Sequence, residues 1–167
     1  MNIVTYNIKR CGSLVKRKKI RSYLTKGGAD ICFIQETKSC KMNDEVVQSI
    51  WGSSDYLWPA LDFRGQSGEI FTIWRKGVLE PIISCRGNGY LGLNASWKGK
   101  KFYFLNVYSS CILSEKRARW SEILELKGSL GEGEWIFGGD FNSIKNSEER
   151  FGRGGHNRLE MKEFGNL

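Results

Sequence analysis

The sequence predicts a mixed α/β protein, and three observations support that fold class. Near the front, short runs rich in β-branched and aromatic residues alternate with helical patterns. In the middle, strand-like runs follow one another, and a helix and a further strand come after them. This order is typical of proteins in which helices cover sheets. The 167 residues, 40% of them hydrophobic, suffice for one domain, and no Ser/Gly-rich linker divides the range 1–167.

The front of the chain predicts two strands and two helices. The strands cover 3–8 and 31–35, and the second run is almost continuously apolar, as in strands buried on both faces. The helical patterns rest on apolar residues at helical spacing: Ile20, Tyr23 and Leu24 in the first helix, and Val46, Val47, Ile50 and Trp51 in the second. Glycines directly after these patterns, at 27–28 and at 52, predict where each helix ends.

The rest of the chain predicts a series of strands, a helix, one more strand and a polar tail. The strands expected in the middle cover 56–63, 70–75, 91–97 and 102–108, and a turn at 98–100 joins the last two as a hairpin. Ser114 is expected to cap a helix whose apolar side carries Trp120, Ile123 and Leu124, with Leu130 as a weaker member. A last strand is expected over 135–141, and the Gly-rich tail 150–167 has only a weak helical pattern at 159–164.

The composition is basic, with a formal net charge of +8 and a pI of about 9.3. A basic surface attracts polyanions such as nucleic acid, although ordinary solubilising charge explains the same numbers equally well. The densest basic run is Lys-Arg-Lys-Lys at 16–19, and short runs of this kind are more often solvated helix faces than binding sites. Charge alone therefore leaves both interpretations open.

The cysteines indicate a reducing compartment, which means the nucleus or the cytoplasm. The five cysteines are an odd number without a C-x-x-C pair, and His156 is the only histidine, so a zinc site is not expected. Cys32 lies inside an apolar run, where a thiol behaves as a small hydrophobic residue. The first residues lack the apolar core of a signal peptide, and no run reaches transmembrane length, so no membrane is predicted as a partner. The sequence identifies no protein partner.

Polar residues follow several predicted strands at points where packing does not require them. Asn7, Glu36, Asp140 and Asn142 each end a strand or begin the loop after it. Because ligands of α/β proteins gather beyond the carboxyl ends of strands, Glu36 and Asp140 are expected to bring two carboxylates to one cleft. Carboxylate oxygens suit Mg²⁺, and the two asparagines can hold a phosphate or a water molecule. Taken singly, each residue also has an ordinary explanation as a loop carboxylate or a turn-capping amide.

Five segments, taken in order, carry a resemblance to a known family: Thr5-Tyr6-Asn7-Ile8-Lys9-Arg10, Ile34-Gln35-Glu36-Thr37-Lys38, Arg64-Gly65-Gln66-Ser67-Gly68, Asn106-Val107-Tyr108 and Gly138-Gly139-Asp140-Phe141-Asn142. Their order and spacing resemble the endonuclease/exonuclease/phosphatase superfamily, which includes apurinic-site DNA nucleases and the endonuclease domains of LINE-type retrotransposons. The segments at 49–68 and 147–150 look specifically like plant LINE-type elements. The resemblance implies a DNase I-like fold, a two-sheet sandwich flanked by helices.

The resemblance also implies a role for individual residues. Glu36 and Asn7 match metal-binding positions, which implies Mg²⁺ as the cofactor, with Mn²⁺ as a possible substitute. Tyr108 matches a tyrosine whose hydroxyl contacts the scissile phosphate. Asp140 matches the aspartate that orients or deprotonates the attacking water, and Asn142 matches an asparagine that supports the phosphate and the leaving group.

The activity implied is Mg²⁺-dependent hydrolysis of phosphodiesters in DNA by an endonuclease of retrotransposon origin. Lys9, Arg10, Ser67 and Gly68 are expected to bind the nucleic acid or to border its cleft. Two alternatives stay open. One is a phosphatase or an RNA-directed enzyme on the same fold, and the other is a non-catalytic remnant that at most binds nucleic acid.

Departures from the family pattern bear on activity. Glu69 stands where the family's loop has a second glycine, and it adds an acid near a cleft for a polyanion. The family's late Asp-His pair and a further aspartate are not among the residues present, and His156 is expected to be an exposed loop residue instead. The last strands of the sandwich are expected to be missing as well. The domain is therefore expected to be incomplete at its C-terminal end and nearly inactive alone.

Overall fold

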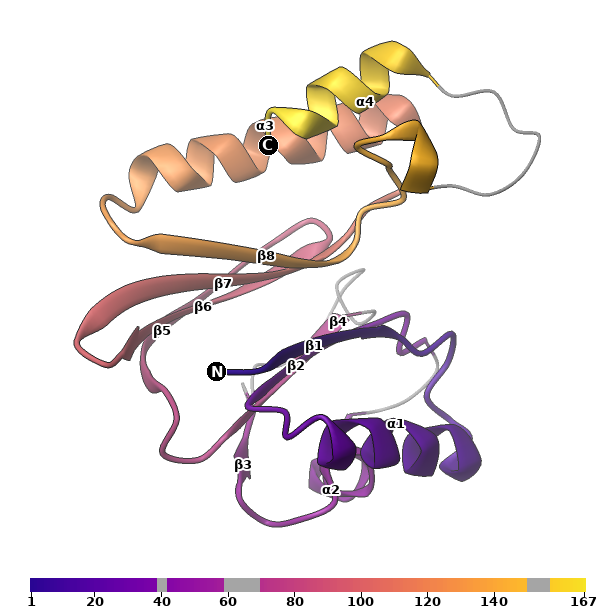
Figure 1. Cartoon of the computed structure of the whole chain (residues 1–167), viewed down its shortest axis with the longest axis vertical. Helices are drawn as coiled ribbons and strands as arrows, with labels where there is room; N and C mark the ends of the chain where they lie inside the picture. The colour runs from indigo at the N-terminus through magenta and orange to yellow at the C-terminus, as the bar shows by residue number, and fades with distance from the viewer. Residues whose placement is uncertain (39–41, 59–69, 150–156) are drawn as a thin grey trace. The chain divides into compact units, whose positions relative to one another are not determined.

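A computed structural model of the chain describes residues 1–38, 42–58, 70–149 and 157–167 (Figure 1). These residues form two compact units. The first unit comprises Met1–Tyr108 and Gly133–Asp140, and the second unit comprises Ser109–Glu132 and Phe141–Leu167. The prediction that the range 1–167 is a single domain stays a prediction. Among the described residues, no helix has the length and apolar character needed to cross a bilayer.

The first unit contains two sheets of four strands each. In one sheet the spatial order is β1-β2-β4-β3, with the bounds β1 (Ile3–Asn7), β2 (Ile31–Gln35), β4 (Ile70–Arg75) and β3 (Tyr56–Leu57). β1 and β2 run parallel, whereas β4 is antiparallel to both of its neighbours. The helix between β1 and β2 is α1 (Leu14–Lys26), and α2 (Asp44–Trp51) follows β2.

The second sheet of this unit has the order β5-β6-β7-β8, with the bounds β5 (Glu80–Gly87), β6 (Tyr90–Trp97), β7 (Lys100–Tyr108) and β8 (Glu134–Asp140). β6 and β7 form the predicted hairpin, and its turn residues Lys98 and Gly99 both have left-handed φ angles, of 50° and 73°. Paired left-handed residues give a two-residue turn the twist that matches antiparallel strands. β7 and β8 run parallel.

Two expectations about the strands need correction. β5 was not predicted, because Pro81 lies inside it and proline argues against a strand interior; the strand forms at the edge of its sheet, with a register shift between Pro81 and Ile83. The strand expected over 56–63 is shorter, since β3 ends at Leu57 and Trp58 is outside it. The remainder of that prediction, from residue 59 onward, lies outside the described residues.

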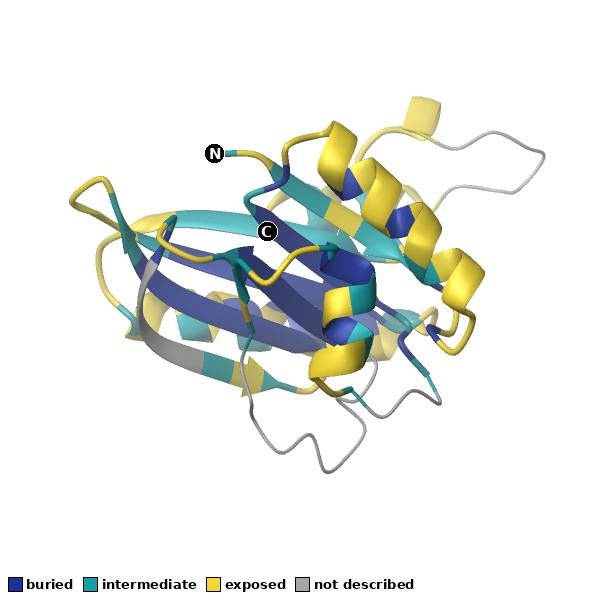
Figure 2. Ribbon diagram, turned by 90° about the horizontal axis from the view of Figure 1, so that it is seen from below, coloured by how far each residue is buried: buried dark blue, intermediate teal, exposed yellow. Residues whose placement is uncertain are grey.

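Apolar residues fill two layers of the first unit, and the central strands are the most buried part (Figure 2). One layer packs the first sheet against α1 and α2 and includes Ile20, Cys32 and Ile50. Burial raises the pKa of the Cys32 thiol to about 12, in keeping with the predicted hydrophobic role of this residue. The other layer lies between the two sheets and includes Phe33 and Phe104.

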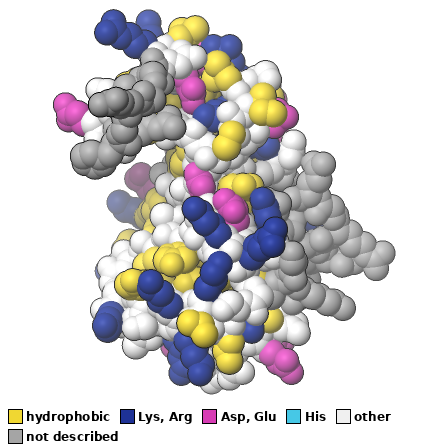
Figure 3. All heavy atoms as spheres, turned by 90° about the vertical axis from the view of Figure 1, so that its right-hand side faces the viewer, with side chains coloured by type: hydrophobic (Ala, Val, Ile, Leu, Met, Phe, Trp, Pro, Cys, Tyr) yellow, Lys and Arg dark blue, Asp and Glu magenta, His cyan; other side chains and the backbone are white. Residues whose placement is uncertain are grey.

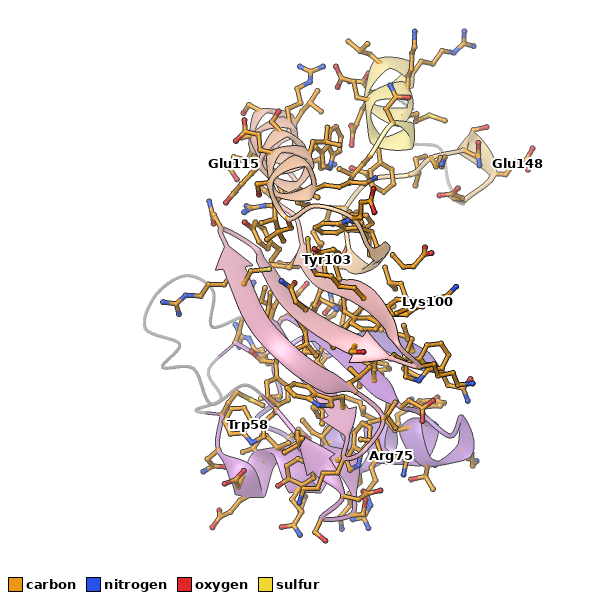
Figure 4. All side chains as sticks on the ribbon, turned by 90° about the vertical axis from the view of Figure 1, so that its left-hand side faces the viewer. Trp58, Arg75, Lys100, Tyr103, Glu115 and Glu148 are labelled. Carbon is orange, nitrogen blue, oxygen red and sulfur yellow. The ribbon has the colours of Figure 1, made fainter. Side chains whose placement is uncertain are left out.

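Aromatic rings also line β7 and β8. The Tyr103 ring, labelled in Figure 4, stacks on Trp135 with ring centroids 4.3 Å apart. The Trp135 ring also stacks on Phe137, with ring centroids 5.6 Å apart. Tyr103 is completely buried. Gly133 lies against the same ring, because a Cβ atom at this position would approach Tyr103 Cε2 to 2.5 Å. These contacts fix β8 beside β7 along their length.

The second unit consists of α3 (Leu113–Ser129), the short 3-10 helix η1 (Ser147–Glu149) and α4 (Arg158–Gly165). The expected Ser114 cap is wrong: α3 begins at Leu113, and the residue before it, Ile112, has no side-chain cap. The chain turns earlier, because the Ser110 hydroxyl accepts a hydrogen bond from Ile112 N at 3.1 Å. Asn157 caps α4, because its Oδ1 accepts hydrogen bonds from Leu159 N at 3.1 Å and from Glu160 N at 3.2 Å.

The apolar side predicted for α3 is only partly buried. Trp120 and Ile123 are buried, whereas the Leu124 side chain is 46% exposed. Within the unit, the Phe164 ring of α4 lies 5.7 Å from Trp120 and 5.1 Å from Phe141. The weak helical pattern at 159–164 therefore corresponds to a real helix, which is held by aromatic contacts.

Candidate active site

The carboxyl ends of four strands set the position of the candidate active site in the first unit. In the parallel pair β1 and β2, Asn7 lies beside Gln35, and in the parallel pair β7 and β8, Tyr108 lies beside Asp140. β8 contacts both β1 and β2, so the two parallel pairs approach each other across the sandwich. Parallel strands end at the same edge of a sheet, and polar residues that follow them are brought together there.

The Asn7 side chain bridges two carboxylates. Its Nδ2 donates a hydrogen bond of 2.7 Å to Glu36 Oε1 and another of 2.8 Å to Asp140 Oδ2. Asp140 is 133 positions away from Asn7 in sequence, so this contact joins the two sheets. The structure thus brings together three of the residues that the sequence singled out. All three are half-buried, which leaves them open to a ligand.

The orientation of the Asn7 amide is fixed by its own loop. Its Oδ1 accepts a hydrogen bond of 3.1 Å from Lys9 N, the arrangement of an Asx turn. Because the oxygen faces an N–H donor and the NH₂ faces two carboxylate acceptors, every contact agrees with this orientation. In this arrangement Asn7 positions Glu36 and Asp140, and its expected part in metal binding stays a prediction.

Glu36 adopts a conformation that most residues avoid. Its φ angle is 55°, and a left-handed non-glycine residue costs about 1–2 kcal/mol. The backbone of the neighbouring loop holds it there, because Glu36 O accepts a hydrogen bond of 2.7 Å from Arg10 N. Strain of this kind persists where surrounding contacts hold it in place, and it gathers at functional sites.

A buried polar network anchors the floor of the site. Gln35 is 1% exposed, and its Nε2 donates hydrogen bonds to Asn106 Oδ1 at 2.7 Å and to Thr5 Oγ1 at 3.1 Å. Asn106, fully buried on β7, donates in turn to Phe71 O at 2.8 Å. The network joins β2 and β4 of one sheet to β7 of the other. Both residues lie inside the motifs noted in the sequence, but their position in a motif gave no sign of this contact.

The two glycines before Asp140 belong to β8. A Cβ atom at Gly138 would lie 2.7 Å from Phe33 Cδ2, so this glycine makes room for the layer between the sheets. A Cβ atom at Gly139, where φ is 137°, would lie 1.9 Å from Val107 O. Both glycines let the end of β8 approach the rest of the first unit closely.

Tyr108 ends β7 and is half-buried. The ammonium group of Lys38 lies over its ring, 5.9 Å from the centroid, and Tyr108 N donates a hydrogen bond of 2.8 Å to Gly89 O. Lys38 stands two positions after Glu36. A cation is thus present near the predicted phosphate-binding tyrosine, and sequence reasoning gave Lys38 no role of its own.

The predicted basic residues differ in how they are used. Lys9 and Arg10 are exposed, and both have left-handed φ angles, of 46° and 75°. In the run at 16–19, Lys16 Nζ donates to Lys9 O at 2.7 Å and Arg17 donates to Ser49 Oγ at 3.1 Å. Half of this run is therefore used for contacts within the unit. Figure 3 shows Lys and Arg side chains gathered on the lower part of the molecule, around a few acidic side chains.

Asn142 belongs to the second unit, and its predicted role at the phosphate stays a prediction. Its φ angle is 48°, and its Nδ2 donates a hydrogen bond of 2.7 Å to Ser109 O. The Lys116 ammonium, 6% exposed, donates to Asn142 O and, at 2.6 Å, to Glu160 Oε1. Ser143 Oγ donates to the same Glu160 oxygen at 2.9 Å. The loop after Asp140 is thus held by side chains of α3 and α4.

The charges around Glu160 shift its ionisation. Burial raises the pKa of the Glu160 carboxyl, but the hydrogen bonds from Lys116 and Ser143 and the charges of Lys116 and Arg117 lower it by more. The pKa therefore lies below its ordinary value, and Glu160 is a carboxylate at neutral pH. Arg117 itself forms an ion pair with a different carboxylate, that of Glu163, at 2.8 Å.

Several predicted residues lie outside the described residues: Ser67, Gly68, Glu69 and His156. Their roles stay predictions. Within the described ranges, no group of three or more His, Cys, Asp or Glu side chains lies close enough to hold a metal ion. Glu36 and Asp140 are thus a pair of carboxylates without a third acidic neighbour in that part of the chain.

Comparisons with solved structures find proteins whose fold is similar to that of this chain. TDP2 from D. rerio, in complex with a single-strand DNA product, matches with a TM-score of 0.62 and 19% identity, over 84% of this chain and 60% of that protein. The endonuclease domain of TRAS1, a telomere-specific non-LTR retrotransposon, matches with a TM-score of 0.66 and 16% identity, over 97% and 69%. Beta toxin from Staphylococcus aureus matches with a TM-score of 0.62 and 13% identity, over 96% of this chain and 68% of that protein.

The likeness is one of fold. It confirms the predicted DNase I-like class, with two sheets and flanking helices. The sequence identities, 19% and 16%, are too low to assign the chain to a family. The chain spans 61% and 60% of the two D. rerio TDP2 structures that it matches. No protein-family model and no curated protein sequence matches the chain.

Proposed function

We propose that this chain carries the catalytic carboxylates of a divalent-metal-dependent phosphodiesterase that hydrolyses DNA. The observation that supports the proposal most is the Asn7 bridge, which holds Glu36 and Asp140 together at the ends of strands from two sheets. Two carboxylates so close together repel each other unless a donor or a cation lies between them. A pair of carboxylates held together in spite of this repulsion, where strands of an α/β fold end, is expected to serve chemistry.

The donor groups present fit Mg²⁺, with Mn²⁺ as a substitute. Mg²⁺ commonly binds one or two protein carboxylates and takes the rest of its ligands from water and phosphate, so a third acidic side chain is not required. Glu36 would hold the metal ion. When bound, such a cation polarises a phosphoryl oxygen and offsets the charge that develops there.

We propose the remaining roles from the family resemblance in the sequence. Asp140 would orient the attacking water and accept its proton, and the Asn7 N–H bond keeps the Asp140 carboxylate in place. The Tyr108 hydroxyl would donate to a phosphate oxygen, with Lys38 adding positive charge beside the ring. Asn142 would support the leaving group. Lys9 and Arg10, both exposed, would bind flanking phosphates.

DNA is the substrate that the observations favour. The net charge is +8, and phosphate neutralisation by Lys and Arg supplies most of the affinity of non-specific DNA binding. Two of the structural matches agree with this: one is TDP2 in complex with a single-strand DNA product, and the other is the endonuclease domain of a retrotransposon. We therefore propose endonuclease activity of retrotransposon type, in keeping with the resemblance found in the sequence.

The experiment is a plasmid-nicking assay under single-turnover conditions, with the chain in excess so that slow cleavage is visible. The wild-type chain should convert supercoiled to open-circular DNA with Mg²⁺ or Mn²⁺ and not with EDTA. Asp140→Asn should lower the rate by about 10²–10³-fold. Asp30→Asn is a matched control, because Asp30 also neighbours a strand end but lies at the opposite end of β2.

Each outcome of the assay decides between the candidate functions. Metal-dependent nicking that is lost in Asp140→Asn but kept in Asp30→Asn supports the proposal. Nicking that survives Asp140→Asn contradicts the assignment of the site. DNA binding without any nicking favours the non-catalytic alternative, and faster cleavage of RNA or release of phosphate from small phosphomonoesters favours the other enzymes of the same fold.

A further inference from the structure

Lys16 makes contacts that set it apart from the other lysines of its basic run. Its Nζ donates a hydrogen bond of 2.7 Å to Lys9 O and lies 3.5 Å from Ile8 O. Lys18 and Lys19 are exposed, and within the described part of the chain their side chains make no hydrogen bond or ion pair. All three are lysines of the same helix, α1.

The position of Lys16 is unfavourable for the helix itself. Lys16 lies in the first turn of α1, where the helix dipole disfavours a cation, and no acidic residue stands in that turn. The N-cap residue Ser13 adds no side-chain hydrogen bond. A lysine at this position therefore does not stabilise the helix. Its favourable interaction is the hydrogen bond with the loop that precedes the helix.

The loop that Lys16 holds is strained. Lys9 and Arg10 are consecutive left-handed residues, with φ angles of 46° and 75°, and neither is a glycine or an asparagine. Two such residues in a row are rare, because each places its Cβ atom too close to the following carbonyl oxygen. The loop keeps this shape only if other groups hold it, and the Lys16 ammonium bonds its carbonyl oxygen directly.

The same loop is hydrogen-bonded to the candidate active site. Lys9 N donates to Asn7 Oδ1 at 3.1 Å, which turns the Asn7 NH₂ toward the two carboxylates. Arg10 N donates to Glu36 O at 2.7 Å, where Glu36 is itself left-handed. The two strained segments therefore support each other, and the Lys16 side chain of α1 bonds the first of them.

We propose that Lys16 is a positioning residue: it holds the Lys9–Arg10 loop in its left-handed form and thereby fixes the Asn7 bridge and Glu36. Lys18 and Lys19, by contrast, act only through their charge on nucleic acid. This inference rests on the proposed function for its catalytic consequence, but the positioning itself is a property of the folded chain. It separates one positioning lysine of the basic run from two lysines that act on DNA.

The kinetic test compares Lys16→Met with Lys19→Met, which remove the same charge from the same helix. Lys16→Met should lower kcat for plasmid nicking by about tenfold, in line with the loss of one hydrogen bond from a charged donor. Lys19→Met should raise KM and weaken the salt dependence of binding without changing kcat. Lys16→Arg, which keeps a charged donor within reach of Lys9 O, should restore most of kcat.

A second measurement needs no activity. In the ¹⁵N–¹H spectrum, the Asn7 side-chain NH₂ signals report directly on the bonds to Glu36 and Asp140. These signals should move in Lys16→Met and stay in place in Lys19→Met. If they move although the wild-type chain does not nick DNA, the positioning stands and the proposed function falls. If they stay in place, or if Lys16→Met and Lys19→Met have the same kcat in an active protein, the inference is overturned and the proposed function is untouched.

Discussion

In the first unit two buried amides, those of Gln35 and Asn106, bond to each other as neutral groups, whereas in the second unit the buried Lys116 is held by charge. Gln35 and Asn106 are joined at 2.7 Å and complete their bonding with the backbone and hydroxyl groups. Lys116, almost equally buried, is joined to the carboxylate of Glu160 at 2.6 Å. Neutral networks do not titrate, but ion pairs do. These two buried contacts should therefore respond differently to substitution and to pH.

The difference also extends to backbone packing. In the first unit, β8 passes so close to β7 that Gly139 has no room for a side chain. In the second unit, Gly131 also has a left-handed φ, of 74°, but nothing lies within 4 Å of a Cβ atom placed there. Close approach of the backbone is thus a feature of the unit that carries the two carboxylates. The predictions that follow test this contrast, and they begin with the largest effect.

Gly139→Ala should lower the free energy of unfolding by about 4 kcal/mol or more, because the new methyl group collides with the Val107 backbone. Gly131→Ala, the matched control, should cost about 1 kcal/mol, since it meets only the left-handed conformation. Urea unfolding followed by circular dichroism measures both. Equal losses for the two variants would show that the close approach of β8 to β7 is not a constraint.

Asn106→Leu should cost about 3 kcal/mol, because it leaves the Gln35 amide and the Phe71 carbonyl buried without their hydrogen bonds. Thr72→Val is the control, since its hydroxyl accepts only a long bond of 3.4 Å from Asn106 and its loss should cost less than about 1 kcal/mol. The same urea measurements apply. A loss for Asn106→Leu no larger than that for Thr72→Val would mean that the network does not hold the sheets together.

Lys116→Met should cost about 2 kcal/mol, less than a fully buried ion pair because Glu160 keeps some contact with solvent. The loss should be local to the second unit and should appear as faster amide hydrogen exchange in α4. Arg117→Met removes an exposed ion pair one residue away and should leave the exchange rates unchanged. Faster exchange throughout β1 and β2 in Lys116→Met would contradict the separation of the two units.

Acid should loosen the second unit through Glu160. The pKa of this carboxyl is lower in the folded chain than its ordinary value of 4.5. A lowered pKa gives stability that is fully present above 4.5 and is lost as the pH falls through the folded value. Protection of α4 amides should therefore fall as the pH is lowered below about 4.5, whereas the neutral Gln35–Asn106 contact should not titrate.

The control for the pH experiment is Glu160→Gln, in which α4 should be less protected at neutral pH and should lose its acid dependence. Asp55 in the first unit also has a lowered pKa, through its hydrogen bond from Ser53 first of all, so a residue-by-residue readout is needed. If α4 in Glu160→Gln keeps the acid response of the wild type, another group is responsible.

The parts of this molecule that sequence reasoning could predict are those that depend on neighbours along the chain. The strand 31–35 followed from a continuous apolar run, and the end of α2 followed from Gly52, which is left-handed with φ of 101°. Asn7, Glu36 and Asp140 could be singled out because each directly follows strand residues in a recognisable motif. The structure adds that one amide group joins them.

The parts that could not be predicted depend on residues far apart in sequence. The bond between Gln35 and Asn106 spans 71 positions, and that between Lys116 and Glu160 spans 44, so no local pattern marks them. The role of Lys16 depends on a carbonyl oxygen seven positions before it, in a loop whose shape the residue types do not favour. β5 was missed because proline usually marks the end of a strand, and the edge of a sheet is the exception.

The most direct test of the central claim is to locate the metal ion. Mn²⁺ should be added in small steps to ¹⁵N-labelled protein in the presence of a short DNA duplex, and the paramagnetic loss of each signal should be followed. We expect the Asn7 side-chain signals and the Glu36 amide to disappear first, and this preference to be lost in Glu36→Gln. Earliest loss around Asp30 or Asp55, at acidic groups outside the Asn7 bridge, would contradict the account.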